Sequence, residues 1–92
     1  MPLTETAVKN AKPRDEAYKL ADSGGLYLLV TPIGSRLWDF KYRFDGREKL
    51  LSFGPHPVTG TKKARVKRDE AKALLIDGLD PSRVRRTARR MA

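Results

Sequence analysis

The 92-residue sequence contains no cysteine and a single histidine, His56. Disulfide bonds and thiolate metal sites are therefore excluded, and one histidine without partners argues against a zinc site. No apolar run approaches the ~20 residues that a membrane-spanning helix needs. The start, MPLTETAVKN, lacks the basic and apolar regions of a signal peptide. We therefore expect a soluble, cytoplasmic protein that does not contact a membrane.

Residue patterns typical of catalysis are also missing. No serine lies in a nucleophile-elbow context, and no two carboxylates have a spacing that suits acid–base chemistry. Asp69 and Glu70 are adjacent on a predicted helix, so their side chains point about 100° apart. Gly24-Gly25 lacks the spacing of a P-loop or a dinucleotide fingerprint. We expect a non-enzymatic chain without cofactor or metal.

Positive charge is abundant and unevenly distributed. The formal net charge is +9, from 20 Lys and Arg against 11 Asp and Glu. Residues 61–92 hold eleven of these cations and only four of the acids. Such a balance favours an acidic partner, most commonly nucleic acid, although solvated helices and tails can be equally basic.

The stretch from Gly25 to Gly54 predicts three antiparallel strands. Asp45-Gly46 suits a two-residue type I′ turn, and Pro32 to Ser35 supplies the other reversal. Tyr18 to Ala21 predicts a short edge strand before the sheet. Period-2 alternation places Trp38 and its even-numbered neighbours up to Phe44 on a core face. The other face is predicted to carry Tyr27, Leu29, Asp39, Lys41, Arg43, Glu48, Leu50 and Ser52.

Two helices complete the prediction. Residues 4–11 predict a short helix capped by Thr4, and a longer helix is expected to begin with a cap at Thr59 or Thr61. This second helix should reach about Asp77, with Gly78 as its C′ residue and Leu79 returning to the core. The fold class is therefore α+β, a small three-stranded antiparallel sheet plus a short edge strand, with the second helix packed on one face. We assign the domain to residues 1–81 and a basic tail, or the start of a linker, to residues 82–92.

The outer face of the sheet is the candidate functional site, because a sheet can enter the major groove of B-DNA. Lys and Arg can contact guanine edges there, and cations near strand ends suit phosphates. The predicted DNA-binding residues are Tyr27, Leu29, Arg36, Lys41, Arg43, Arg47, Lys49 and Ser52. Two alternatives are an RNA-binding module, in which an exposed Tyr27 stacks on a base, and a protein-interaction module.

The order of several short motifs resembles a known family. LTETAVKNAKP is followed by Asp22 and Gly25-Leu26-Tyr27-Leu28, then Leu51-Ser52-Phe53-Gly54, and finally Gly78-Leu79-Asp80-Pro81. This order is similar to the N-terminal arm-type DNA-binding domain of phage and prophage integrases, which are tyrosine recombinases. The resemblance covers residues 3–81.

The resemblance implies a small α+β domain that binds the arm-type attachment sites flanking a recombination core site. It further implies separate core-binding and catalytic domains in the whole integrase, so that no catalytic tyrosine is expected in this chain. Double-stranded DNA is the expected partner, with other integrase protomers or an excisionase as further candidates.

Overall fold

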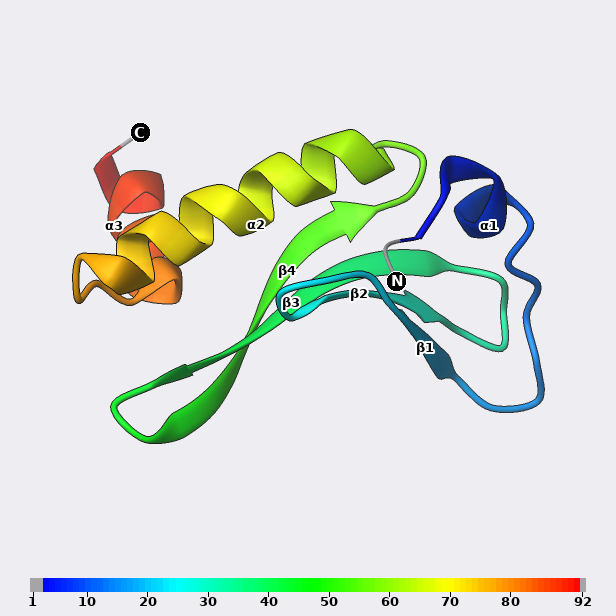
Figure 1. Ribbon diagram of the computed structural model, residues 1–92, viewed down its shortest axis with the longest axis horizontal. Helices are drawn as coiled ribbons and strands as arrows, with labels where there is room; N and C mark the ends of the chain where they lie inside the picture. The colour runs from blue at the N-terminus through cyan, green and yellow to red at the C-terminus, as the bar shows by residue number, and fades with distance from the viewer. Residues whose placement is uncertain (1–2, 92) are drawn as a thin grey trace.

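The protein, seen here as a computed structural model, is described from residue 3 to residue 91, with side chains to residue 88. It is an α+β domain of three helices and four strands within that range (Figure 1). The elements in order are α1 (Glu5–Lys9), β1 (Tyr18–Ala21), β2 (Leu26–Val30), β3 (Arg36–Phe44), β4 (Arg47–Pro55), α2 (Thr61–Ile76) and α3 (Pro81–Met91). None of the helices within residues 3–91 is long and apolar enough to cross a membrane.

The strands form one antiparallel sheet in the order β1-β2-β3-β4. The α+β class and the antiparallel sheet are confirmed, and β1 is a regular fourth strand whose four residues all pair with β2. Asp45 and Gly46 have φ values of 53° and 74°, as a type I′ turn requires. Because β2 pairs with β3 only as far as Phe40, the distal ends of β3 and β4 project as a two-stranded hairpin.

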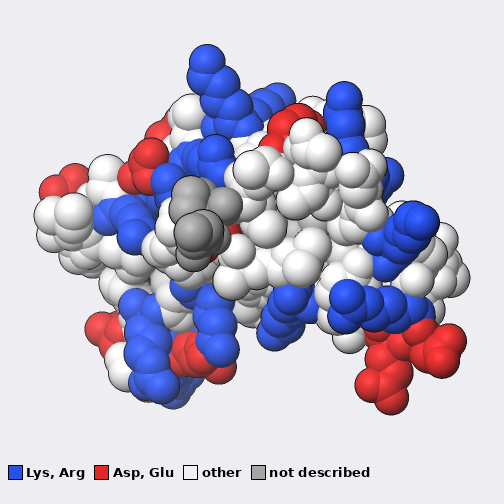
Figure 2. All heavy atoms as spheres, turned by 45° about the vertical axis from the view of Figure 1, so that its right-hand side comes forward, with Lys and Arg blue, Asp and Glu red and all other residues white. Residues whose placement is uncertain are grey.

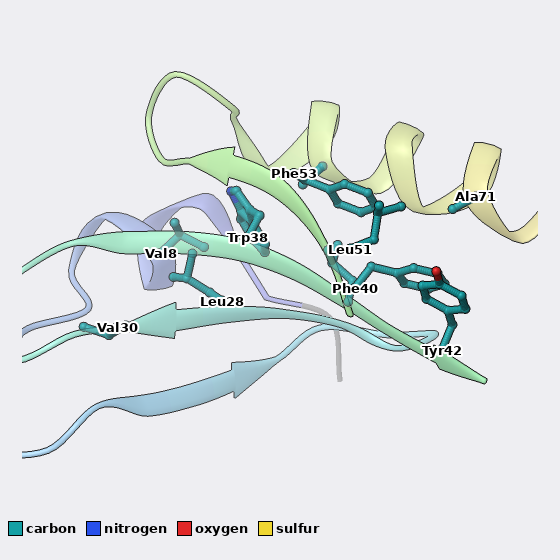
Figure 3. Packing of buried hydrophobic residues seen from close by; sticks show 11 residues of the cluster. Val8, Leu28, Val30, Trp38, Phe40, Tyr42, Leu51, Phe53 and Ala71 are labelled. Carbon is teal, nitrogen blue, oxygen red and sulfur yellow. The ribbon is translucent and has the colours of Figure 1, made fainter. Parts of the chain in front are cut away.

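The core lies between the sheet and the helices α1 and α2. Trp38, Phe40 and Leu28 are at most 1% exposed, and Val8 of α1 and Ala71 of α2 complete the same cluster (Figure 3). Thr4 caps α1, since its Oγ1 accepts a hydrogen bond from the Ala7 amide at 3.0 Å. Both helices cover the same face of the sheet, so the opposite face carries no helix among the described residues.

The ends of α2 differ from the sequence-based prediction. The N-cap is Gly60 without a side-chain hydrogen bond, so the predicted capping by Thr59 or Thr61 is wrong. The Thr59 side chain binds β4 instead of the helix, because its Oγ1 donates a hydrogen bond to the Phe53 carbonyl at 2.8 Å. At the C-terminus the Leu79 amide bonds to the Leu74 carbonyl at 2.9 Å, closing a Schellman motif with Gly78 in the left-handed region. Leu79 itself is 46% exposed, so its predicted return to the core is also wrong.

The arginine-rich segment that the sequence suggested as a tail forms α3. Asp80 begins this helix, since its carboxylate accepts the Ser82 amide at 3.0 Å and its carbonyl accepts the Val84 amide at 3.0 Å. Pro81 occupies the first helical position, where its missing N–H costs nothing. The same Asp80 carboxylate accepts the Tyr42 hydroxyl at 2.6 Å and pairs with the Lys49 ammonium. This network fixes α3 to the projecting part of β3 and β4.

A second buried carboxylate, Asp22, fixes α2 and the N-terminal segment. It accepts the Leu3 amide at 2.6 Å, Arg65 Nη2 at 2.8 Å and Arg68 Nη1 at 3.1 Å. Burial raises the pKa of Asp22, but the hydrogen bonds from Arg65 and Leu3 outweigh it and leave the pKa below its usual value. In Asp80, burial is likewise outweighed, by Lys49 and Tyr42, and the pKa falls to about 2.

These lowered pKa values predict that acid destabilises the fold. A carboxyl group whose pKa is depressed in the folded state contributes stability above its unfolded pKa and loses it as the pH falls through the folded value. We expect the free energy of unfolding to decline from about pH 5 and Asp80 alone to contribute about 2 kcal/mol of the loss. Urea titrations at pH 7, 4 and 2.5 would measure this. If the free energy of unfolding of Asp80→Asn fell with pH as steeply as that of the wild type, the contribution assigned to Asp80 would be contradicted.

Candidate nucleic-acid interface

The outer face is defined here as the side of the sheet that faces away from α1 and α2. Strand register assigns its members, because residues paired directly across two strands lie on the same side. Of the residues predicted for this face, Lys41, Arg43, Leu50 and Ser52 are exposed and Leu29 is half-buried. The structure therefore brings these five side chains onto one surface that no described helix covers.

The projecting hairpin holds the most accessible part of the outer face. Arg43 pairs across the strands with Glu48, and Lys41 pairs with Leu50, whose side chain is 58% exposed. Lys41 Nζ lies 2.8 Å from Glu48 Oε1, and both side chains are about half exposed. The hydrogen bond from Lys41 lowers the pKa of Glu48, which keeps this carboxylate charged near neutral pH. One of the two predicted base-contacting cations is therefore already ion-paired.

Tyr27 lies on the outer face but is not accessible. Only 8% of the residue is exposed, so the prediction of an exposed aromatic ring is wrong. The Lys19 ammonium lies over the ring, 4.9 Å from its centroid, and Asp39 faces it as the paired residue on β3. Burial, followed by the Asp39 charge, raises the pKa of Tyr27, and burial raises the pKa of Asp39 as well. Lys19, Tyr27 and Asp39 thus form a compact polar cluster on the four-stranded part of the face.

The three cations predicted to bind phosphates from strand ends lie on the other side of the sheet. Arg36 donates through Nη1 to the carbonyls of Val8 and Lys9 at 3.0 and 2.6 Å, which satisfies the C-terminus of α1. Lys49 pairs with Asp80, and Arg47 pairs across the hairpin with core-facing Phe44. The structure therefore separates Arg36, Arg47 and Lys49 from Lys41 and Arg43, and a role in DNA binding for them remains a prediction.

Sequence reasoning missed two residues that shape this region. Lys19 lies on the outer face, where it is paired with Leu29. Glu48 was predicted on this face by the alternation, but its contact with Lys41 was not, because that contact depends on the register of the hairpin. Arg85 of α3 donates to the Ser52 carbonyl at 2.6 Å along the outer edge of β4. No pattern in the sequence indicated that contact, because it depends on the orientation of α3.

The part of the chain that the structure describes has no cluster of candidate metal ligands. It contains no group of three or more His, Asp or Glu side chains that could hold a metal ion. His56 is buried, and its Nε2 lies 3.0 Å from Glu5 Oε1, which joins α1 to the loop before α2. The contact lowers the pKa of Glu5 and serves the docking of α1.

Most of the positive charge lies outside the outer face. The outer face carries Lys19, Lys41 and Arg43 against Asp39 and Glu48, which nearly balance. The segment 61–92, which forms α2 and α3, has a net charge of +7 from eleven cations and four acids. Figure 2 shows Lys and Arg side chains scattered over the visible surface with a few carboxylates between them, and not a single basic patch. Charge alone therefore does not single out the outer face.

Comparison with known proteins decides the family. The arm DNA-binding domain family matches residues 3–88, nearly the whole chain. The chain belongs to the arm DNA-binding domain family. It is 50% identical over 91 residues to the integrase of Enterobacteria phage P4, covering 97% of this chain and 21% of that protein.

Two further relatives are also integrases. The prophage integrase IntZ of Escherichia coli K12 is 43% identical over 82 residues, covering 87% of this chain and 20% of IntZ. The integrase of Shigella phage Sf6 is 35% identical over 86 residues, covering 94% of this chain and 22% of that integrase. The chain thus spans about a fifth of the length of the curated relatives it matches. The matched family is that of an arm DNA-binding domain, and the resemblance to phage and prophage integrases is confirmed.

Proposed function

We propose that this arm DNA-binding domain binds double-stranded DNA at the arm-type attachment sites of a phage or prophage integrase, in integration and excision. The observation that carries the proposal is the helix-free outer face of the projecting hairpin, with Lys41, Arg43 and Leu50 exposed on it. Other integrase protomers or an excisionase are proposed as additional partners in the whole recombinase.

The shape of the hairpin supports insertion into the major groove. That groove is about 12 Å wide and admits a two-stranded β-ribbon. Beyond Phe40 only β3 and β4 continue, so the hairpin can enter without a clash from β1 or β2. Lys and Arg donors can then reach guanine acceptors, and the exposed Leu50 can contact a thymine methyl group.

Arg43 is expected to be a base contact. Arg43→Ala should weaken binding to the preferred arm sequence by about 1–3 kcal/mol and should have a smaller effect on DNA of arbitrary sequence. Fluorescence anisotropy with both duplexes would measure the two losses. Lys62→Ala on α2 is a suitable control, because it removes one exposed cation away from the sheet and should weaken both duplexes equally. Equal losses on both duplexes for Arg43→Ala would make it a phosphate contact.

The experiment that tests the proposal itself uses labelled duplexes tiling the two arms of the attachment site of the element that encodes the chain. Each duplex and a scrambled counterpart would be titrated between 50 and 300 mM salt. We expect one or more arm duplexes to bind in preference to their scrambled forms at every salt concentration. Equal and steeply salt-dependent binding to all duplexes would show only the electrostatic attraction of the +9 chain, and would overturn arm-site recognition by this domain.

The RNA-binding alternative loses its main support. It depended on an exposed aromatic ring that could stack on an unpaired base. Tyr27 is the aromatic residue in question, and Lys19 covers its ring. Duplex DNA therefore remains the better-supported ligand.

A further inference from the structure

The outer face carries an ion pair between Lys41 and Glu48. Lys41 Nζ and Glu48 Oε1 lie 2.8 Å apart on the part of the hairpin best placed to meet DNA. A carboxylate at such a position opposes binding to any phosphate, because like charges brought together without a counter-ion are costly. Both side chains are about half exposed, so the pair contributes little to the stability of the fold.

We infer that Glu48 is a positioning residue for Lys41, which directs its ammonium toward neutral acceptors on base edges and away from phosphates. The inference rests on the proposed function and deepens it, since it concerns how the same surface discriminates between DNA sequences. In this arrangement Glu48 lowers the affinity for DNA of arbitrary sequence.

The donor count of the ammonium explains the selectivity. Lys41 has three N–H donors, and the bond to Glu48 occupies one of them. The other two can reach O6 and N7 of a guanine, which are uncharged and leave the ion pair in place. A phosphate competes with Glu48 for the same positive charge, so binding it requires that the ion pair be broken or that two anions share one cation. Neutral acceptors are therefore favoured over anionic ones.

The surroundings of the pair strengthen this arrangement. Glu48 is paired across the strands with Arg43 and ion-paired with Lys41, so one carboxylate is next to both candidate base-contacting cations. Charge from Arg43 adds to the hydrogen bond from Lys41 in lowering the pKa of Glu48. Among the described residues 41–50, Glu48 is the one acid that strand pairing assigns to the outer face, while Asp45 lies in the turn and Asp39 is paired with Tyr27 on the four-stranded part.

The test is a double-mutant cycle of Glu48→Gln and Lys41→Ala, read by fluorescence anisotropy on a scrambled 20-bp duplex. Glu48→Gln should tighten binding about five- to tenfold near 0.1 M salt and increase the magnitude of the salt slope by about 0.9, which is one additional phosphate contact. Glu70→Gln removes the same charge from the exposed surface of α2, on the other side of the sheet, and should change affinity less than twofold.

The cycle distinguishes positioning from simple repulsion. The quantity compared is the change in log Kd for the scrambled duplex that Glu48→Gln causes. If Glu48 acts through Lys41, this change should be less than half as large in the Lys41→Ala background as in the wild type. An effect that stays larger than half overturns the inference, as does an effect no larger than that of Glu70→Gln. Thermal unfolding of each variant would show that the fold is retained, as exposed positions predict.

The inference and the proposed function can fail separately. Arm recognition is judged by the preference of the wild type for an arm duplex over its scrambled form. The role of Glu48 is judged on the scrambled duplex, where arm recognition plays no part. With arm recognition established, Glu48→Gln should also narrow the preference for the arm duplex by about fivefold, and an unchanged preference would overturn the inference.

Discussion

Trp38→Ala is expected to lower the free energy of unfolding by about 3–5 kcal/mol. Trp38 is completely buried beneath the helices, in contact with the cluster that joins α1 to the sheet. Its removal would leave a cavity and an unpaired carbonyl at Thr59, which now accepts the indole N–H at 2.9 Å. A domain of this size has a total stability on the order of 5–15 kcal/mol, so the loss is a large part of the whole.

Urea unfolding followed by circular dichroism would measure the effect, because the variant lacks the only tryptophan. Leu50→Ala is the matched control, since it also truncates a large apolar side chain in the sheet but at a position 58% exposed on the outer face. The control should change stability by less than about 0.5 kcal/mol. Similar losses for both variants would contradict the division of the sheet into a core face and an outer face.

Asp22→Asn is expected to destabilise the fold by about 2–4 kcal/mol. The carboxylate is fully buried and accepts hydrogen bonds from Arg65, Arg68 and the Leu3 amide. An asparagine fills the same volume but supplies one acceptor oxygen instead of two and turns its amide donors toward guanidinium groups. Two cations, one of them only 14% exposed, would then lack their counter-charge.

Asp69→Asn provides the comparison for this variant. Asp69 bonds to Arg68 as well, at 3.0 Å, but its side chain is 67% exposed. Exposed ion pairs are worth about 0–1 kcal/mol, so its loss should be small. Urea unfolding at pH 7 of both variants would measure the difference. A loss for Asp69→Asn as large as that for Asp22→Asn would show that burial of the pair is not what matters.

The strands could be predicted from the sequence because their signals are local. Alternating apolar residues from Trp38 to Phe44 and the Asp45-Gly46 turn define the hairpin without reference to the rest of the chain. The edge strand β1 has the bounds expected from the sequence, Tyr18–Ala21, and the other three strands lie within the predicted stretch or end one residue beyond it. The short helix after Thr4 could be predicted for the same reason, since the side chain that caps it is only three residues from the amide it binds.

What could not be predicted depends on contacts between distant segments. The segment from Pro81 onward has too little apolar content to suggest packing, yet Asp80 joins it to Tyr42 and Lys49 on the sheet. Tyr27 faces outward as the alternation predicts, but Lys19 of the neighbouring strand covers it. The same limit applies to the candidate site. Alternation placed Lys41 and Arg43 on the outer face, whereas the engagement of Lys41 with Glu48 required the register.

The separation of charge between the helices and the outer face has a kinetic consequence. The field of α2 and α3 acts at long range and is the same for every duplex, so it speeds the encounter with DNA regardless of sequence. The nearly balanced outer face adds little to that encounter and exerts its influence only at contact. Under the proposed mode of binding, the right and wrong sites are therefore captured at similar rates, and they differ in how long the domain stays.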